Sequence, residues 1–92
     1  GAEINKPQAT SAALLEKKSI LIAITQSGNV IYGGQEIGVA GVRLLVKQLL
    51  SRKKMPVILQ VDAEVKTRLL VAVMDEAKKA GASKVSIATV AD

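Results

Sequence analysis

The last third of the chain holds the pattern that most constrains the fold. Residues 57–61 form an apolar, β-branched run, residues 65–80 are amphipathic with helical spacing, and residues 84–90 again resemble a strand. Gly81 stands where the helix should stop. A strand, a helix and a second strand in this order predict a parallel pair with a right-handed crossover. The helix, about 24 Å long, must then pack on one face of the sheet.

The first half of the chain predicts a β-hairpin followed by another helix. Residues 20–24 are almost continuously apolar, which indicates a buried strand. The turn-forming residues 26–29 lead into a short return strand at 30–32, and Gly33-Gly34 ends it. Apolar residues then recur with helical spacing from 39 to 50.

These elements define the expected architecture. Their order is ββαβαβ, and we predict an α+β fold, a two-layer sandwich whose small mixed sheet carries two helices on one face. The length of 92 residues allows one domain at most. The polar stretch around Pro7 predicts a flexible N-terminal linker at residues 1–18, and the folded domain then covers 19–92. Such a sheet leaves one face uncovered and its edge strands open for pairing.

Composition narrows the class of protein further. Hydrophobic residues make up 49% of the chain, which excludes a wholly disordered protein. The only aromatic residue is Tyr32, so the core must be aliphatic. Without cysteine the chain has no disulfide and no thiolate metal site, and it also has no histidine.

The net charge of +5 leaves two interpretations open. One is an acidic partner, such as nucleic acid, an anionic lipid surface or an acidic protein; the other is ordinary solubilising charge. Nucleic acid is disfavoured because stacking aromatics are missing and the lysines are spread along the chain. The densest basic run, Arg52-Lys53-Lys54, follows a predicted helix, where cations favour the helix dipole in any case.

Few residues are candidates for chemistry. Asp62 and Glu64 could form a carboxylate pair for acid–base work or for Mg²⁺, but an N-cap of the second helix explains Asp62 better. The dipeptide Gly33-Gly34 fits a turn better than a phosphate cradle. Thr25 and Ser27 have no base partner in the sequence. We therefore expect no catalytic residue, no metal and no cofactor.

With the elements placed, the chain resembles the periplasmic domain of the ExbD/TolR family. The resemblance covers about residues 4–89 and depends on the order and spacing of several segments rather than on any single one. These segments are Ile4-Asn-Lys-Pro7-Gln-Ala9, Gly28-Asn-Val-Ile-Tyr32-Gly33, Pro56-Val-Ile-Leu-Gln-Val-Asp62, Val73-Met-Asp75, Ala80-Gly81 and Lys84-Val-Ser-Ile-Ala-Thr89. The chain departs from the family at Lys66-Thr67, where many members carry an aromatic residue, and at the glycine-rich start of its first helix.

The resemblance implies a function. Members of this family cross the inner membrane once, place this domain in the periplasm and work with an ExbB/TolQ-type channel subunit. Proton flow through that complex drives TonB or TolA. The resemblance therefore implies a homodimeric accessory subunit of a motor, driven by the proton motive force, that energises TonB-dependent outer-membrane transport. Residues 1–18 would follow a membrane helix that this chain lacks.

The resemblance also implies where partners bind. The segment formed by Ile4, Asn5, Lys6, Pro7, Gln8 and Ala9 is expected to add as a strand to an open sheet edge, for example in the partner protomer. A TonB-type extended segment would compete for the same edge. Asp62 matches an aspartate of the family, and with Leu70 and Met74 it is the expected partner-binding surface of helix and sheet. Leu70 and Met74 also border the apolar stripe of the second helix, which favours a core position.

Three alternatives remain open on sequence grounds. The first is a TolR-like subunit of the Tol–Pal system that binds peptidoglycan. The second is a small-molecule-binding regulatory domain, for which Gly33-Gly34 is the only hint. The third is an enzyme, which would require that turnover be lost on Asp62→Asn.

Overall fold

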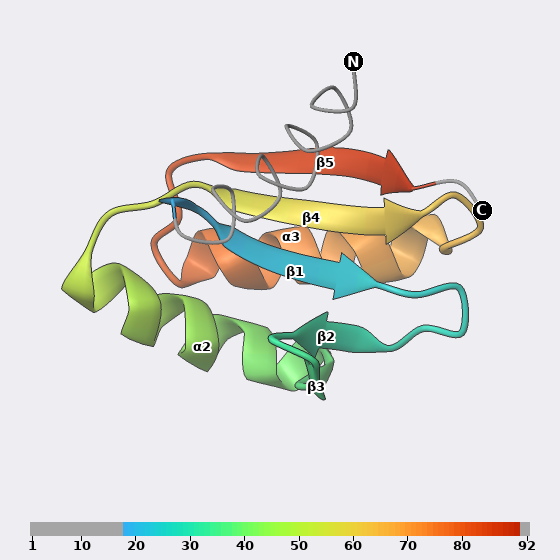
Figure 1. The fold of residues 1–92 in the computed structure, drawn as a ribbon, viewed down its shortest axis with the longest axis horizontal. Helices are drawn as coiled ribbons and strands as arrows, with labels where there is room; N and C mark the ends of the chain where they lie inside the picture. Colours follow the sequence, from blue (N-terminus) through green and yellow to red (C-terminus); the bar gives the residue numbers. More distant parts are fainter. Residues whose placement is uncertain (1–17, 91–92) are drawn as a thin grey trace, which may run out of the picture.

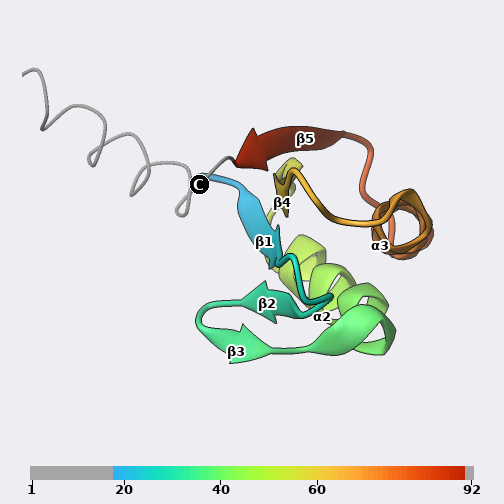
Figure 2. The same ribbon diagram turned by 90° about the vertical axis from the view of Figure 1, so that its right-hand side faces the viewer.

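The computed structural model describes residues 18–90 of the chain. Within this range the elements are β1 (Ile20–Ile24), β2 (Val30–Tyr32), β3 (Gln35–Glu36), α2 (Gly38–Arg52), β4 (Val57–Asp62), α3 (Thr67–Lys79) and β5 (Val85–Val90). The strands form one sheet in the order β3-β2-β1-β4-β5. Both helices lie on the same face of this sheet (Figures 1 and 2). The predicted two-layer α+β sandwich is therefore confirmed. All of the predicted linker except Lys18 lies outside the described residues, so the boundary between linker and domain stays a prediction.

The sheet is mixed, as predicted. β1, β4 and β5 run parallel, and Ile20, Val57 and Val85 stand side by side at their first residues. β2 and β3 are antiparallel additions beyond β1. In Figure 1, α3 lies behind the sheet while β5 lies above β4. This arrangement is the right-handed crossover expected for a parallel strand–helix–strand unit.

The strand β3 is an element that the sequence did not predict. Gly33 and Gly34, with φ of +58° and +81°, reverse the chain after β2. Two consecutive positive φ values are typical of the tight hairpin turns that match the twist of a sheet. The turn itself is confirmed, but the antiparallel part of the sheet does not end at Tyr32, because Gln35 pairs with it. A strand of two exposed residues is too short to leave an alternating pattern in the sequence.

The core lies between the sheet and the two helices. Alternate residues of each central strand point toward the helices and are buried. The runs in the sequence are nearly continuous because most intervening residues, such as Leu21 and Ile58, are also apolar and are half-buried on the other face. The fully or almost fully buried side chains are Ile20, Ile22, Ile24, Val30, Val42, Val46, Val57, Leu59, Val61, Val73 and Ala77. Burying one valine, leucine or isoleucine side chain contributes about 1.5–3 kcal/mol, so this aliphatic set is the main source of stability.

The other face of the sheet carries no helix within residues 18–90 (Figure 2). The strand register places Leu21, Ala23, Ile58 and Gln60 on this face, and all are half-buried. In the part of the chain that the structure describes, one face of the sheet is therefore without a helix, as the sequence predicted. Its middle combines Ala23 with the polar Gln60, and Leu21 and Ile58 lie nearer the start of the strands.

The two helices begin differently from the prediction. Helix α2 runs beyond the predicted 39–50 at both ends, and its first residue, Gly38, has φ of +69°. Helix α3 begins at Thr67, two residues after the predicted start. The residue before it, Lys66, has an extended backbone conformation. Gly81, with φ of +108°, follows α3 as the predicted stop. Neither helix of the described chain has the length and apolarity needed to cross a bilayer.

Candidate functional site

The outer edge of β5 is the most exposed pairing surface of the sheet. Among the described strands, β5 pairs only with β4, and residues 86–89 are exposed. Ile87 keeps 46% of its surface accessible. Protein edge strands are usually blunted by charged side chains, proline or short length. The six residues Val85–Val90 contain neither a charge nor a proline, so this edge is suited to adding another strand.

The hydrogen-bond register shows which backbone groups of β5 face outward. The N–H of Val57 donates to the carbonyl of Lys84 at 2.9 Å, while Val57 lies opposite Val85. In a parallel ladder, alternate residues bond to the same neighbour, so the even-numbered residues of β5 face β4. The N–H and C=O groups on the outer edge therefore belong to Val85, Ile87 and Thr89.

The opposite edge of the sheet is much less suited to pairing. It is formed by β3, which has two exposed residues and ends in the charged Glu36. A short strand with a charge offers few free backbone groups to an incoming chain. Of the two sheet edges in the described structure, β5 is therefore the candidate site for strand addition.

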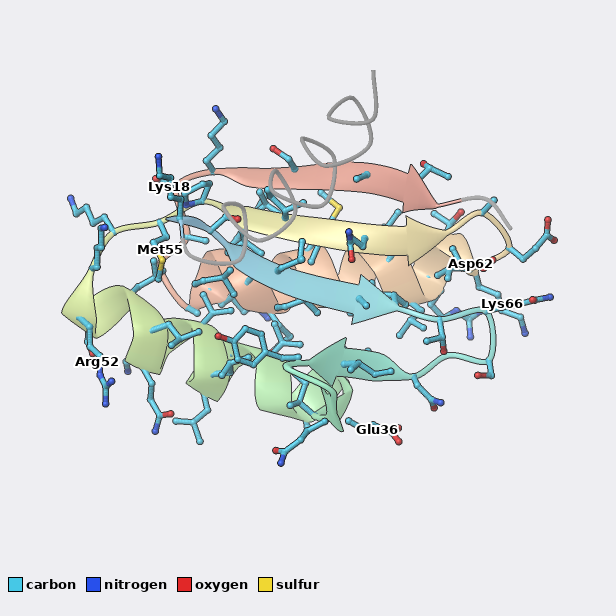
Figure 3. The ribbon with its side chains drawn as sticks, in the orientation of Figure 1. Lys18, Glu36, Arg52, Met55, Asp62 and Lys66 are labelled. Carbon is cyan, nitrogen blue, oxygen red and sulfur yellow. The ribbon has the colours of Figure 1, made fainter. Side chains whose placement is uncertain are left out.

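Asp62 is the last residue of β4 and shapes the turn that follows. Its Oδ1 accepts a hydrogen bond from the N–H of Glu64 at 2.9 Å, and its carbonyl accepts one from Val65 at 3.0 Å. Helix α3 begins beyond this turn and has no side-chain cap at Lys66. The expectation that Asp62 caps the second helix was therefore wrong, because its carboxylate is engaged within its own turn. Figure 3 places Asp62 and Lys66 together at this end of the molecule.

A shallow depression of about 220 Å³ adjoins Asp62 at the carboxyl ends of β1 and β4. Gln60, Thr25 and Gln26 also line it. Its walls offer amide, hydroxyl and carboxylate oxygens without a cationic group. Within residues 18–90, no three acidic, histidine or cysteine side chains are grouped so that they could hold a metal ion.

Thr25 and Ser27 stabilise the turn between β1 and β2. Their hydroxyl oxygens are 3.1 Å apart, and the N–H of Asn29 donates to Oγ1 of Thr25 at 3.0 Å. Hydroxyl groups that form hydrogen bonds within a turn stabilise the conformation of that turn. Gly28, with φ of +91°, completes the same turn.

Leu70 and Met74 lie one turn apart on α3 and are half-buried against the core. Asp62 lies two residues after Gln60 in β4, and side chains two residues apart in a strand point to the same face. Asp62 therefore belongs to the helix-free face of the sheet. The structure therefore separates the three residues expected to form a helix and sheet surface. Their role in partner binding stays a prediction. Ile4, Asn5, Lys6, Pro7, Gln8 and Ala9 lie outside the described residues.

The contact between the two helices includes an ion pair that the sequence did not reveal. The guanidinium of Arg43 on α2 forms two hydrogen bonds of 3.0 Å with the carboxylate of Glu76 on α3. Within α3, the neighbouring Asp75 pairs instead with Lys79 one turn later on the same helix, at 3.0 Å. No local spacing could indicate a partner 33 residues away.

The fold and its open edge define a small α+β domain suited to pairing with other chains. A family model described as biopolymer transport protein ExbD/TolR matches residues 1–92. The chain therefore belongs to the ExbD/TolR family, which confirms the resemblance seen in its sequence.

A relative is the "Biopolymer transport protein exbD2" of Vibrio cholerae serotype O1 (strain ATCC 39315 / El Tor Inaba N16961). It is 28% identical over 89 residues. The match covers 96% of this chain and 66% of the relative, so this chain spans slightly less than two thirds of the relative's length.

Proposed function

We propose that this chain is the periplasmic domain of an accessory subunit in an inner-membrane motor of the ExbB–ExbD type. In this proposal the motor uses the proton motive force to energise TonB-dependent outer-membrane transport. Family membership supports the transport role. The observation that carries the mode of action is the outer edge of β5, which has no charged residue and pairs with no other strand of the described chain.

The proposed mechanism is strand addition to β5. An extended segment of a TonB-type or TolA-type transducer would pair with the outward N–H and C=O groups of Val85, Ile87 and Thr89. Main-chain bonds of this kind supply affinity, and neighbouring side chains select the sequence. Ile87 lies on the helix side of the sheet, opposite Leu59. Its exposed side chain would be covered by the added strand and by the side chains that this strand carries.

The segment Ile4–Ala9 is proposed to occupy the same edge when no transducer is bound. In a homodimer, each protomer would lend this segment to its partner. The edge would then be protected in the resting state and released when the transducer competes for it. The ExbB/TolQ-like channel subunit would act through the membrane part of the protein, and this domain would act by binding, without catalysis.

NMR chemical-shift mapping tests the proposal. The labelled 92-residue chain and a version without residues 1–9 are titrated with periplasmic peptides of TonB-type and TolA-type transducers. We expect shifts along β5 and at the neighbouring β4 residues, with tighter binding once residues 1–9 are removed. A scrambled peptide of the same composition is the control. Absence of shifts with every transducer peptide, or shifts confined to another surface, would overturn strand addition at β5.

A further inference from the structure

One end of the molecule gathers most of its positive charge. The N–H of Ile20 donates to the carbonyl of Pro56 at 2.8 Å, and the N–H of Val57 donates to the carbonyl of Lys84 at 2.9 Å. These bonds hold side by side the three segments that enter β1, β4 and β5. The lysines carried by these segments are Lys18, Lys54 and Lys84.

Both helices end on the same side of the molecule as these strand starts. Arg52 lies in the last turn of α2, and Lys78 and Lys79 lie in the last turn of α3. Figure 3 places Lys18 and Arg52 at one end of the domain, opposite Asp62 and Lys66. We call this surface the basic end and define it by Lys18, Lys47, Arg52, Lys53, Lys54, Lys78, Lys79 and Lys84. It contains eight of the 13 lysine and arginine residues of the chain.

Local structure explains only part of this cluster. The helix dipole favours cations in a last helical turn, which accounts for Arg52, Lys78 and Lys79. Lys54 and Lys84 lie outside the helices, and Lys47 lies before the last turn of α2. Among the described residues, the only basic-end side chain in an ion pair is Lys79, which binds Asp75. The remaining charges are thus free to face an anionic partner.

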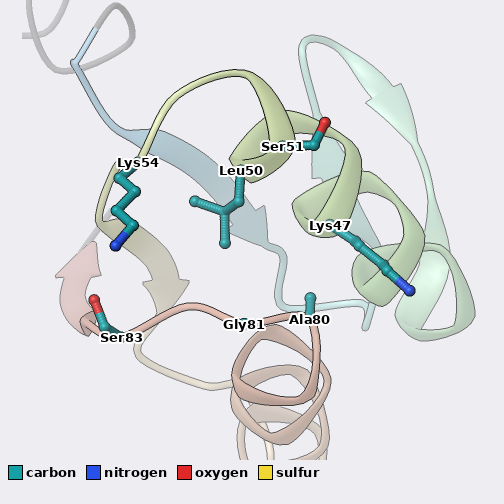
Figure 4. Close-up of a pocket in the computed structure, with 7 residues that line it drawn as sticks. All are labelled: Lys47, Leu50, Ser51, Lys54, Ala80, Gly81 and Ser83. Atoms are coloured by element: carbon teal, nitrogen blue, oxygen red, sulfur yellow. The ribbon is translucent and has the colours of Figure 1, made fainter.

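A cleft of about 370 Å³ opens in the basic end, between the C-terminal half of α2 and the turn after α3 (Figure 4). Leu50 projects into it and Ala80 lies beneath, so its floor is apolar. Lys54 and Ser83 lie on one side of the opening and Lys47 on the other (Figure 4). An apolar floor flanked by ammonium and hydroxyl groups suits an anionic group attached to an apolar body.

We propose that the basic end docks on a bilayer that contains anionic phospholipid, with a lipid phosphate held at the cleft. Lysine stems lie along apolar surface while their ammonium groups reach out to charge, and basic residues near an anionic bilayer are drawn to it. The described part of the chain begins at Lys18, which lies at this end of the domain. The inference depends on the proposed function in one respect, namely that it places the domain beside a membrane.

Vesicle binding tests this docking with matched charge variants. The 92-residue chain is sedimented with vesicles of phosphatidylglycerol and phosphatidylcholine, and with vesicles of phosphatidylcholine alone. The variant Lys47→Gln/Lys54→Gln loses two charges at the basic end; Lys66→Gln/Arg68→Gln loses two exposed charges at the opposite end. We expect the first variant to lower binding to the anionic vesicles roughly twentyfold and the second by less than about threefold. Circular dichroism melts verify that both variants fold.

The other outcomes overturn the proposal. Equal losses in both variants would mean that net charge alone drives binding, and equal binding to both kinds of vesicle would exclude recognition of anionic lipid. Saturable NMR shifts at the cleft with inorganic phosphate, without preference for anionic vesicles, would assign a site for a free anion. Displacement of the chain from vesicles by poly-glutamate at equal charge concentration would favour an acidic protein partner.

The docking test and the strand-addition test fail independently. The Lys47→Gln/Lys54→Gln variant leaves the edge of β5 unchanged, so it should keep its response to transducer peptides. Loss of vesicle binding with retained peptide binding supports both proposals. Peptide binding without any affinity of the parent chain for anionic vesicles would remove the docking proposal alone, and vesicle binding without a peptide response would remove strand addition alone.

Discussion

Arg43 and Glu76 join the two helices by a two-point contact, with Nε to Oε1 and Nη2 to Oε2 both at 3.0 Å. A planar guanidinium that binds a carboxylate at two points fixes orientation as well as distance. The contact thus joins α2 to α3 beside the apolar core that both helices share. The pKa of Arg43 is raised, mainly by the side-chain hydrogen bond with Glu76 and secondly by the negative charge of Glu76. Because the charged form of Arg43 is the one that Glu76 favours, this contribution to stability is lost as the pH rises through the pKa of the guanidinium, in strong alkali.

A double-mutant cycle should detect this contact. We expect favourable coupling between Arg43→Met and Glu76→Gln in urea unfolding at low ionic strength. Because Arg43 is exposed, the coupling should shrink at about 1 M NaCl, where the Debye length falls to about 3 Å. The control pair is Asp75→Asn with Lys79→Met, a single-point contact within α3 that should couple more weakly. Equal coupling in both cycles, or no salt dependence, would contradict the assignment.

Leu59 is the side chain whose truncation should affect stability most clearly. It is completely buried at the centre of β4, on the face of the sheet that carries the helices. Leu59→Ala should lower the free energy of unfolding by about 2–5 kcal/mol, a large part of the stability of a small domain. Leu44→Ala is the matched control, because Leu44 is 63% exposed and its loss should change stability by less than about 0.5 kcal/mol. Chemical denaturation of both variants checks this, and similar losses would mean that the core is placed wrongly.

The backbone conformation at position 38 explains why α2 begins with a glycine. Its φ of +69° is a conformation that side chains with a Cβ adopt at a cost of about 1–2 kcal/mol. Gly38→Ala should therefore destabilise the protein by about 1 kcal/mol, although alanine is the better helix former elsewhere. The measurement is urea unfolding beside Gln48→Ala, an exposed substitution within the same helix. A gain in stability from Gly38→Ala would show that the first turn does not need a positive φ.

Replacing Thr89 by proline should remove one backbone N–H donor from the outer edge of β5. The hydrogen bonds between β5 and β4 should remain. The N–H of Thr89 faces the free edge, and edge strands tolerate proline at such positions. Thr89→Pro should weaken binding of a transducer peptide by about fivefold, since one main-chain hydrogen bond contributes about 1 kcal/mol.

Thr89→Val is the control for this substitution, because it changes the side chain and keeps the N–H. Binding by the two variants is measured in the same NMR titration. If Thr89→Pro binds as well as Thr89→Val, the peptide does not add to this edge.

The sequence by itself determined the layers of the fold. The apolar runs of β1 and β4, the helical spacing in α2 and α3 and the stop at Gly81 were all sufficient, because each depends on local periodicity. Family membership was also visible, since the order of several short segments carries it. The signals failed where an element was too short, as in β3, or where two explanations fit one residue. Asp62 looked like a helix cap, although it stabilises the turn at residues 62–65, which ends before α3 begins at Thr67.

Only the tertiary structure decided which surfaces are available. Whether β5 lies at an edge depends on the strand order, and strand order depends on long-range packing that no local pattern records. The same reason hides the pairing of Arg43 with Glu76 and the collection of Lys47, Lys54 and Lys84 at one end. Residues far apart in sequence meet there because parallel strands start at the same end of the sheet and the helices that cover them end there. Charge and periodicity are properties of the chain, but their arrangement in space belongs to the fold.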